Sequence, residues 1–166
     1  MKLIGMLFIV VSAGSVGFRI AFLLKKRCSL VRQFLQALQV LRNEITFCAT
    51  PLPQAFALMA VSSDGTLGRL FSDVAKDMDR RRWATPQAAM EKALEQTPEE
   101  LLAPILIALS KSLGKYDLDA QLMGIEAARQ ECETLLQNLE RERSLKSRTY
   151  ETLGICAGLA AVILLL

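Results

Sequence analysis

Residues 29–48 read SLVRQFLQALQVLRNEITFC, and this stretch decides the fold class. Its apolar residues recur every three or four positions, which is the spacing of one face of an α-helix. This face comprises Leu30, Phe34, Leu38, Leu41, Ile45 and Cys48, and is widened by Val31 and Leu35. No stretch from residue 29 to 150 alternates apolar and polar residues as a half-buried strand does. The sequence therefore predicts an all-α domain, an antiparallel helical bundle with short turns.

Three threonine–proline pairs predict where further helices begin: Thr50-Pro51, Thr85-Pro86 and Thr97-Pro98. Threonine is favoured as the N-cap of a helix, and proline is favoured at the first helical position. Glu100 follows Thr97 by three residues and adds a capping box to the third pair.

The helices between these caps are short and amphipathic. A turn at residues 62–65, SSDG, precedes a helix predicted from about residue 66 to residue 81. The apolar face of that helix comprises Leu67, Leu70, Phe71, Val74 and Met78. Another helix is predicted from residue 86 to about residue 94, and a mostly apolar one covers residues 98–113. Pro104 either kinks this last helix or starts a new one after a broken turn.

The longest helix is predicted from Leu118 to about Tyr150, with Gly114 ending the preceding helix and Asp117 as its N-cap. Its apolar stripe comprises Leu118, Leu122, Ile125, Cys132, Leu136 and Leu139. Two interpretations of the stripe stay open: packing against neighbouring helices, and a homotypic coiled coil. The charged residues Glu126, Glu133 and Glu140, with the i,i+4 pairs Arg129–Glu133 and Glu142–Lys146, indicate a solvated face and not paired catalytic carboxylates.

The apolar excess of the chain lies at its two ends. Apolar residues make up 52% of the 166 residues, which excludes disorder as the main state. Leu3–Leu24 could cross a hydrocarbon core of roughly 30 Å, and Lys25, Lys26 and Arg27 follow it as a stop-transfer signal. A signal peptide is the competing interpretation. The apolar run continues past the small residues 12–14, which favours an uncleaved transmembrane helix over residues 1–24.

The C-terminal apolar segment is shorter. Residues 152–166 predict a short transmembrane helix, and whether it spans the bilayer fully stays open. Gly154 and Gly158 form a G-x-x-x-G pattern, and Ala13 and Gly17 have the same spacing. Such small residues predict close packing, either of the two segments or of protomers in a homo-oligomer.

Basic residues border both terminal segments on the sides that face the middle of the chain. They are Lys25, Lys26 and Arg27 after the first segment, and Lys146 and Arg148 before the second. The positive-inside rule therefore predicts that the bundle domain, residues 25–151, faces the cytoplasm.

The chain lacks several residue types and spacings that catalytic and metal sites use. It contains no histidine, and its four cysteines lack C-x-x-C spacing, so we expect no catalytic site, no cofactor and no metal. A net charge of +3 is too small to indicate nucleic acid. We therefore expect protein and lipid as the partners.

Two segments are candidate partner contacts. The first is Arg80, Arg81, Arg82 and Trp83, because arginine and tryptophan are enriched in protein interfaces. The second is Lys115 and Tyr116. The alternatives are a solvated loop with the tryptophan in the core, and a turn that Gly114 and Asp117 explain structurally.

Three segments together resemble the stage III sporulation protein AB family. They are Ala49-Thr50-Pro51-Leu52-Pro53, Leu113-Gly114-x-x-Asp117-x-x-x-Gln121 and Tyr150-x-x-Leu153-Gly154-x-x-x-Gly158-Leu159. The resemblance covers essentially the full chain. This sequence has Ser110-Lys111 where the family often has Gly-Glu, and Ala89-Met90 where a tryptophan often follows alanine.

The resemblance implies a membrane protein of endospore-forming bacteria, in the mother-cell outer forespore membrane. It implies a subunit of the secretion-like channel complex between mother cell and forespore. The helical domain is similar to the cytoplasmic domain of the inner-membrane platform protein of type II secretion and type IV pilus machines. By that analogy, the implied partners are the other channel subunits and a secretion-type ATPase.

Three functions stay open at this point. The first is a non-enzymatic platform or scaffold of the sporulation channel. The second is a general type II secretion or type IV pilus platform protein, which usually carries two copies of the bundle, whereas this chain carries one. The third is a membrane-anchored enzyme with an unrecognised site.

Overall fold

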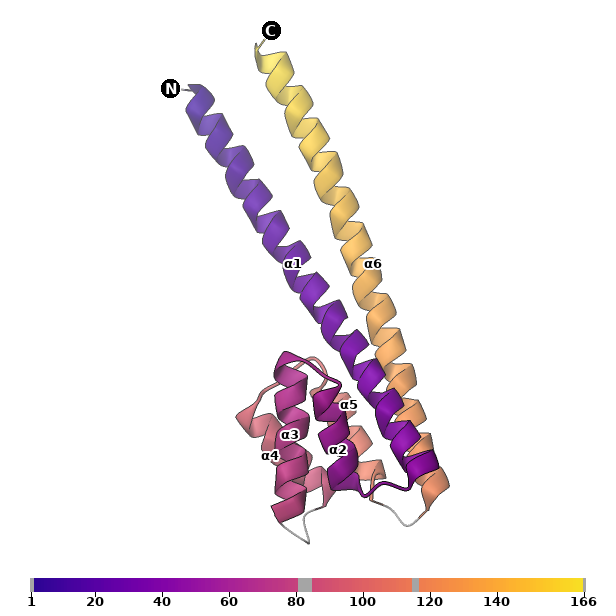
Figure 1. Ribbon diagram of the computed structural model, residues 1–166. Helices are drawn as coiled ribbons and strands as arrows, with labels where there is room; N and C mark the ends of the chain where they lie inside the picture. The colour runs from indigo at the N-terminus through magenta and orange to yellow at the C-terminus, as the bar shows by residue number, and fades with distance from the viewer. Residues whose placement is uncertain (1, 81–84, 115–116, 166) are drawn as a thin grey trace. The chain divides into compact units, whose positions relative to one another are not determined.

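The protein is all-helical in the part of the chain that its computed structural model describes, which confirms the all-α prediction. The backbone is described for residues 2–80, 85–114 and 117–165, and the side chains for 22–80, 85–114 and 117–145. The elements are α1 (Lys2–Asn43), the π-helical turn η1 (Glu44–Cys48), α2 (Leu52–Val61), α3 (Gly65–Arg80), α4 (Pro86–Gln96), α5 (Ala103–Ser112) and α6 (Leu118–Leu165) (Figure 1).

The chain divides into two compact units. The first comprises Met1–Cys28 and Gln137–Leu166, and the second comprises Ser29–Leu136. The first unit consists of the N-terminal part of α1 and the C-terminal part of α6, so both terminal apolar segments are helical. Most of their side chains, including those of the small-residue motifs, lie outside the described residues. In the portion of the chain that is described, no helix has the length and apolar character that a membrane crossing requires.

The second unit is organised around Phe71 of α3. The ring centroid of Phe71 lies 6.1 Å from that of Phe34 on α1 and 6.3 Å from that of Phe56 on α2. All three side chains are fully buried. The other large side chains that are fully buried are Leu38, Leu41, Met59, Leu67, Leu70, Met90, Leu102, Leu106 and Leu109. One apolar core therefore joins α1, α2, α3, α4 and α5.

The predicted stripe of α1 is correct in its middle and wrong at its end. Val31, Phe34, Leu38 and Leu41 are buried with Ala37. Ile45, in contrast, is only half-buried and Cys48 is exposed. The reason is η1: its i→i+5 hydrogen bonding widens the helical turn, which rotates the following side chains away from the core.

The capping predictions differ in outcome. Thr85 is the N-cap of α4, and its Oγ1 accepts a hydrogen bond from the Ala88 N–H at 3.2 Å, as predicted. The capping box at Thr97 is wrong, because Thr97 ends α4 and its N–H donates to the Ala93 carbonyl. Helix α5 begins only at Ala103, after a turn.

The late start of α5 has a packing reason. Leu102, Leu106 and Leu109 are all buried, and a helix that begins at Ala103 places the latter two on its core face. Burial of this apolar surface outweighs the local preference of Thr97 for an N-cap. Pro104 therefore lies in the first helical turn, in agreement with the second of its two predicted roles.

Helix α3 matches its prediction closely. The helix begins at Gly65, which has φ +62°, and Leu67, Leu70, Phe71 and Val74 are buried. Met78, at the end of the predicted face, is half-buried.

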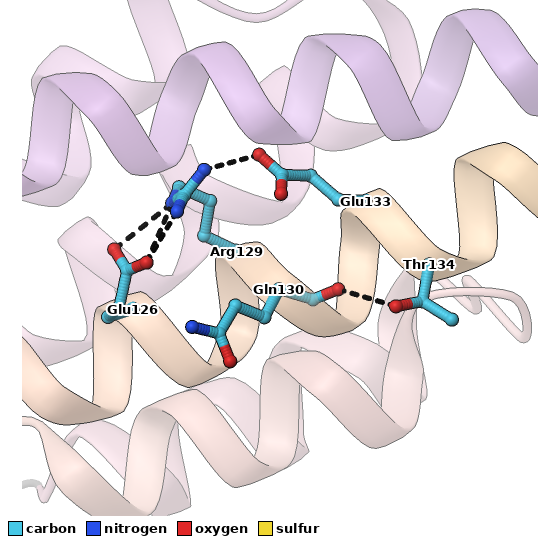
Figure 2. Close-up of polar contacts among 5 residues, drawn as sticks. All are labelled: Glu126, Arg129, Gln130, Glu133 and Thr134. Carbon is cyan, nitrogen blue, oxygen red and sulfur yellow. Dashed lines mark hydrogen bonds and ion pairs between the residues drawn. The ribbon is translucent and has the colours of Figure 1, made fainter.

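Helix α6 begins at its predicted cap and carries a salt-bridge network on one face. Asp117 Oδ1 accepts a hydrogen bond from the Asp119 N–H at 3.0 Å. Figure 2 shows the guanidinium of Arg129 between the carboxylates of Glu126 and Glu133. The hydrogen bonds and the charge of Arg129 lower the pKa of Glu126. This confirms the predicted Arg129–Glu133 pair; the partner residue Lys146 of the second predicted pair has a side chain outside the described part.

The core side of α6 is narrower than predicted. Ile125, Cys132 and Leu139 are buried, together with Ala128. Leu122 and Leu136 are half-buried, and Leu118 is 44% exposed. Their partial exposure follows from the drift of an α-helix relative to a strict seven-residue repeat.

We predict that Gly68→Ala destabilises the protein by about 1–3 kcal/mol. A Cβ at position 68 would lie 2.4 Å from the Ser63 carbonyl oxygen and 3.2 Å from that of Ala60. The Ser63 oxygen belongs to the α2–α3 connection and the Ala60 oxygen to the last turn of α2, and neither backbone atom can move aside as a side-chain end could. Urea unfolding should show a lower midpoint, although alanine is the better helix former by about 1 kcal/mol. Ser72→Ala in the same helix is the control, and an unchanged midpoint for Gly68→Ala would contradict the close approach.

Candidate functional site

Several of the predicted motifs lie at one end of the second unit. The end of η1 and the start of α2, the end of α3 and the start of α4, and the end of α5 and the start of α6 lie at this end, and the α2–α3 and α4–α5 connections lie at the other (Figure 1). The arrangement follows from the up-and-down order of neighbouring helices joined by short turns. We call the residues 49–52, 85–86, 113–114 and 117 the three-loop end.

Gly114 is where the loops touch. A Cβ on Gly114 would lie 3.2 Å from Pro86 Cγ and 3.7 Å from Leu52 Cδ1. Gly114 also has φ +76°, a conformation that favours glycine. Leu52 and Gly114 belong to two of the sequence segments that resemble one family. These two segments therefore pack together in space, and Pro86 packs against Gly114 at the same point.

Thr50 does not cap α2, which corrects the prediction made for it. The N-cap of α2 is Pro51, which offers no side-chain hydrogen bond. Thr50 Oγ1 instead donates a hydrogen bond of 2.6 Å to Glu44 Oε2, and the Thr50 N–H donates to the Glu44 carbonyl at 3.1 Å. The physical reason is that a hydrogen bond to a carboxylate is charge-assisted and stronger than one between neutral groups, so it favours the side-chain orientation that points the hydroxyl at Glu44. Thr50 therefore holds the end of η1 and leaves the start of α2 to the carbonyl of Pro51.

The residue before Thr50 has an unusual backbone conformation. Ala49 has φ +49° and ψ +35°, in the left-handed region, and its N–H closes η1 by donating to the Glu44 carbonyl. Side chains other than glycine rarely adopt this conformation, because the Cβ approaches the following carbonyl oxygen. Two residues before Ala49, the side chain of Phe47 is 81% exposed. The periodicity of the sequence missed this exposed aromatic residue, because nothing in it indicated a π-helical turn.

Asp117 and Gln121 hold the start of α6. The Gln121 N–H donates to the Asp117 carbonyl at 3.2 Å, in addition to the cap made by the carboxylate. Asp117 therefore has a structural role, because its carboxylate and its carbonyl accept hydrogen bonds from the first turn of α6.

The candidate contact residues are only partly described. Arg80 is exposed at the end of α3. The others, Arg81, Arg82, Trp83, Lys115 and Tyr116, lie outside the described residues. The described residues next to these segments are Arg80, which ends α3, and Thr85, Gly114 and Asp117, which belong to the three-loop end.

The titratable groups of the unit form no cluster suited to metal chemistry. Among the described residues, no group of three or more Cys, Asp or Glu side chains could hold a metal ion. Desolvation, and then the charges of Glu131 and Glu133, raise the pKa of the Cys132 thiol to about 12. That thiol is therefore protonated and unreactive at neutral pH, whereas Cys48 is exposed.

The comparisons with known proteins agree with this architecture. The family model for stage III sporulation protein AB matches residues 2–166. The chain belongs to this family. A stage III sporulation protein AB from Bacillus subtilis (strain 168) is 28% identical over 171 residues, which cover 100% of this chain and 99% of the relative. A solved structure of a stage III sporulation protein AB has the same fold, with a TM-score of 0.63 and 24% identity over 70% of this chain and 94% of that chain.

Of the four residues that depart from the resembled family pattern, Lys111 is exposed and the other three are buried. Ser110 is buried, and its hydroxyl donates to the Ile107 carbonyl of the same helix at 2.8 Å. Ala89 and Met90 are also buried. All three side chains therefore contribute to the core of the second unit.

We predict that Ala49→Gly raises the stability of the protein by about 0.5–1 kcal/mol. Glycine removes the left-handed strain of roughly 1–2 kcal/mol, and the greater freedom of the unfolded chain offsets part of the gain. The measurement is the urea midpoint of the purified chain. Ala57→Gly, at an exposed position inside α2, is the matched control and should lower stability by about 1 kcal/mol. A decrease for both variants would refute the assignment of strain to Ala49.

Proposed function

We propose that this chain is a non-enzymatic platform subunit of the secretion-like channel complex between mother cell and forespore. It is anchored in the mother-cell outer forespore membrane by its two terminal helices, and its bundle domain faces the cytoplasm. The observation that carries the proposal is the match to the sporulation family over residues 2–166. A match of this extent includes both apolar ends and the bundle, so it is not limited to one shared module.

The continuity of α1 and α6 supports the role of a platform subunit. α1 and α6 each continue without interruption from a terminal apolar segment into the second unit. Lys25, Lys26 and Arg27 are exposed on α1 directly after the first apolar segment, where they would meet lipid headgroups. Each of the two helices therefore links a terminal apolar segment to the second unit within one continuous element of the chain.

We place the docking surface for the channel's secretion-type ATPase at the three-loop end. Arg80 and Phe47 provide an exposed cation and an exposed aromatic ring near it, two residue types enriched in protein interfaces. The backbone there is held by the Thr50–Glu44 hydrogen bond and the packing of Gly114 on Pro86 and Leu52. A surface made of firmly held turns binds with little loss of conformational entropy.

We predict that a deletion of this protein in its host blocks development after engulfment, and that Arg80→Glu fails to restore it. A charge reversal in the docking surface should lower heat-resistant spores at least a hundredfold relative to the wild-type gene. Arg69→Glu is the matched control, since Arg69 is exposed on the same helix α3 but in its first half, and it should restore sporulation.

Normal spore counts in the deletion strain would refute the channel function itself. Restoration by Arg80→Glu to the level of Arg69→Glu would refute the docking surface and leave the channel function standing. Immunoblots of the membrane fraction show whether each variant accumulates normally.

A second prediction concerns membrane topology and uses Cys48. Cys48 is exposed, whereas Cys28 and Cys132 are buried and Cys132 has its raised pKa, so an impermeant maleimide reports on Cys48 in a Cys156→Ser background. In intact bacteria with the chain in the plasma membrane, Cys48 should stay unlabelled, and it should label after lysis. Cys48→Ser is the control for specificity. Labelling of Cys48 in intact cells would contradict a cytoplasmic bundle.

A further inference from the structure

The exposed face of α1 opposite the core differs in composition from the other long helix surfaces. Between Arg32 and Arg42, α1 contains no charged residue. The solvent-facing side chains of this stretch are Gln36 and Gln39, with Asn43 just beyond it. The exposed faces of α3 and α6, in contrast, carry charged residues throughout their described lengths, among them Arg69, Lys76, Asp79, Asp119, Glu131 and Arg141.

This face of α1 is hollowed and ends in an exposed aromatic ring. A shallow depression of about 370 Å³ is lined by Leu35, Gln36, Gln39, Val40 and Asn43, all from α1. Phe47, one turn beyond Asn43, is 81% exposed. The side chain of Asn43 makes no hydrogen bond to the helix end that it precedes. Depletion of charge around apolar side chains is the compositional mark of an interface core.

The spacing of the face matches a seam between two helices. Gln36, Val40 and Asn43 follow one another on α1 at steps of four and three residues, and the exposed Phe47 comes after them on the π-helical turn η1. Steps of three and four residues keep side chains on one line of a helix that pairs with another helix. We call Gln36, Val40, Asn43 and Phe47 the α1 seam.

We propose that the α1 seam binds the α1 seam of a second copy of this chain, with the two helices parallel. Across a two-fold axis each residue meets its own symmetry mate. Identical charges would repel there, whereas amide side chains carry both donors and acceptors and can pair with themselves. Gln36 and Asn43 are such amides, and Val40 and Phe47 add apolar contact between them. A polar residue at one position of such a seam also sets its register.

The parallel direction rests on the proposed function, because copies anchored in one membrane share one orientation. The seam from residue 36 to residue 47 is only about 16 Å long. It is too short to bury the 1,200 Å² or so typical of a stable complex in solution. Anchoring in a membrane raises the effective concentration of the second copy, which allows a short seam to pair.

The test is disulfide crosslinking of the full chain in phospholipid vesicles, in a background where Cys48 and Cys156 are serine. Single variants Gln36→Cys and Asn43→Cys should each form a crosslinked dimer with their own symmetry mates under mild oxidation. Val61→Cys is the control, because Val61 is 87% exposed on α2 and lies outside the seam. We expect at least tenfold more dimer for Gln36→Cys and Asn43→Cys than for Val61→Cys.

A second pair of variants tests the chemistry of the seam without changing its shape. Gln36→Glu with Asn43→Asp should reduce crosslinking through Val40→Cys at least tenfold, and high salt should restore part of it. Both substitutions are nearly isosteric at exposed positions, so the bundle keeps its fold. Equal crosslinking at Gln36 and Val61, or no effect of the two acidic residues, would overturn the proposal.

Flotation of the vesicles tests the membrane anchor separately from the dimer at the α1 seam. Vesicles that carry the protein without seam crosslinks refute the dimer and leave the membrane platform standing. Protein that does not float contradicts the membrane anchor, and crosslinking of that protein at Gln36 in concentrated solution would still support the seam.

Discussion

The packing of Phe71 against Phe34 and Phe56 is the contact on which the second unit depends. These three rings come from α3, α1 and α2, and the centroid of Phe71 lies 6.1 Å from that of Phe34 and 6.3 Å from that of Phe56. Aromatic side chains bury more apolar surface than aliphatic ones and prefer such offset arrangements. Because the rings fix three helices against one another, they also fix where the turns between those helices emerge.

The three-loop end is a consequence of that packing. The helices alternate in direction, so every second turn returns to the same end of the unit. There the turns are held by specific contacts: Thr50 on the carboxylate of Glu44, and Gly114 against Pro86 and Leu52. None of these contacts requires catalytic chemistry. They hold the three-loop end together.

Capping and turn residues predicted much of this architecture. Thr85, Asp117 and Gly65 act as their local chemistry indicates. Thr97 and Thr50 do not, and in each case a competing interaction explains the difference. Burial of Leu102 and its neighbours delays the start of α5, and the carboxylate of Glu44 takes the hydroxyl of Thr50. The spacing of residues along the sequence predicts neither the burial of Leu102 nor the hydrogen bond between Thr50 and Glu44.

The sequence by itself determined the all-α class, the order and approximate bounds of the helices, and the family to which the chain belongs. These follow from periodicity and from short motifs, both of which are local along the chain. Only the tertiary structure decided that the motifs at Leu52 and Gly114 meet, and that α1 ends in a π-helical turn which turns Cys48 outward and leaves Phe47 exposed. The physical reason is that contacts between distant residues, and the helix distortions that accommodate them, depend on which side chains the core can bury together.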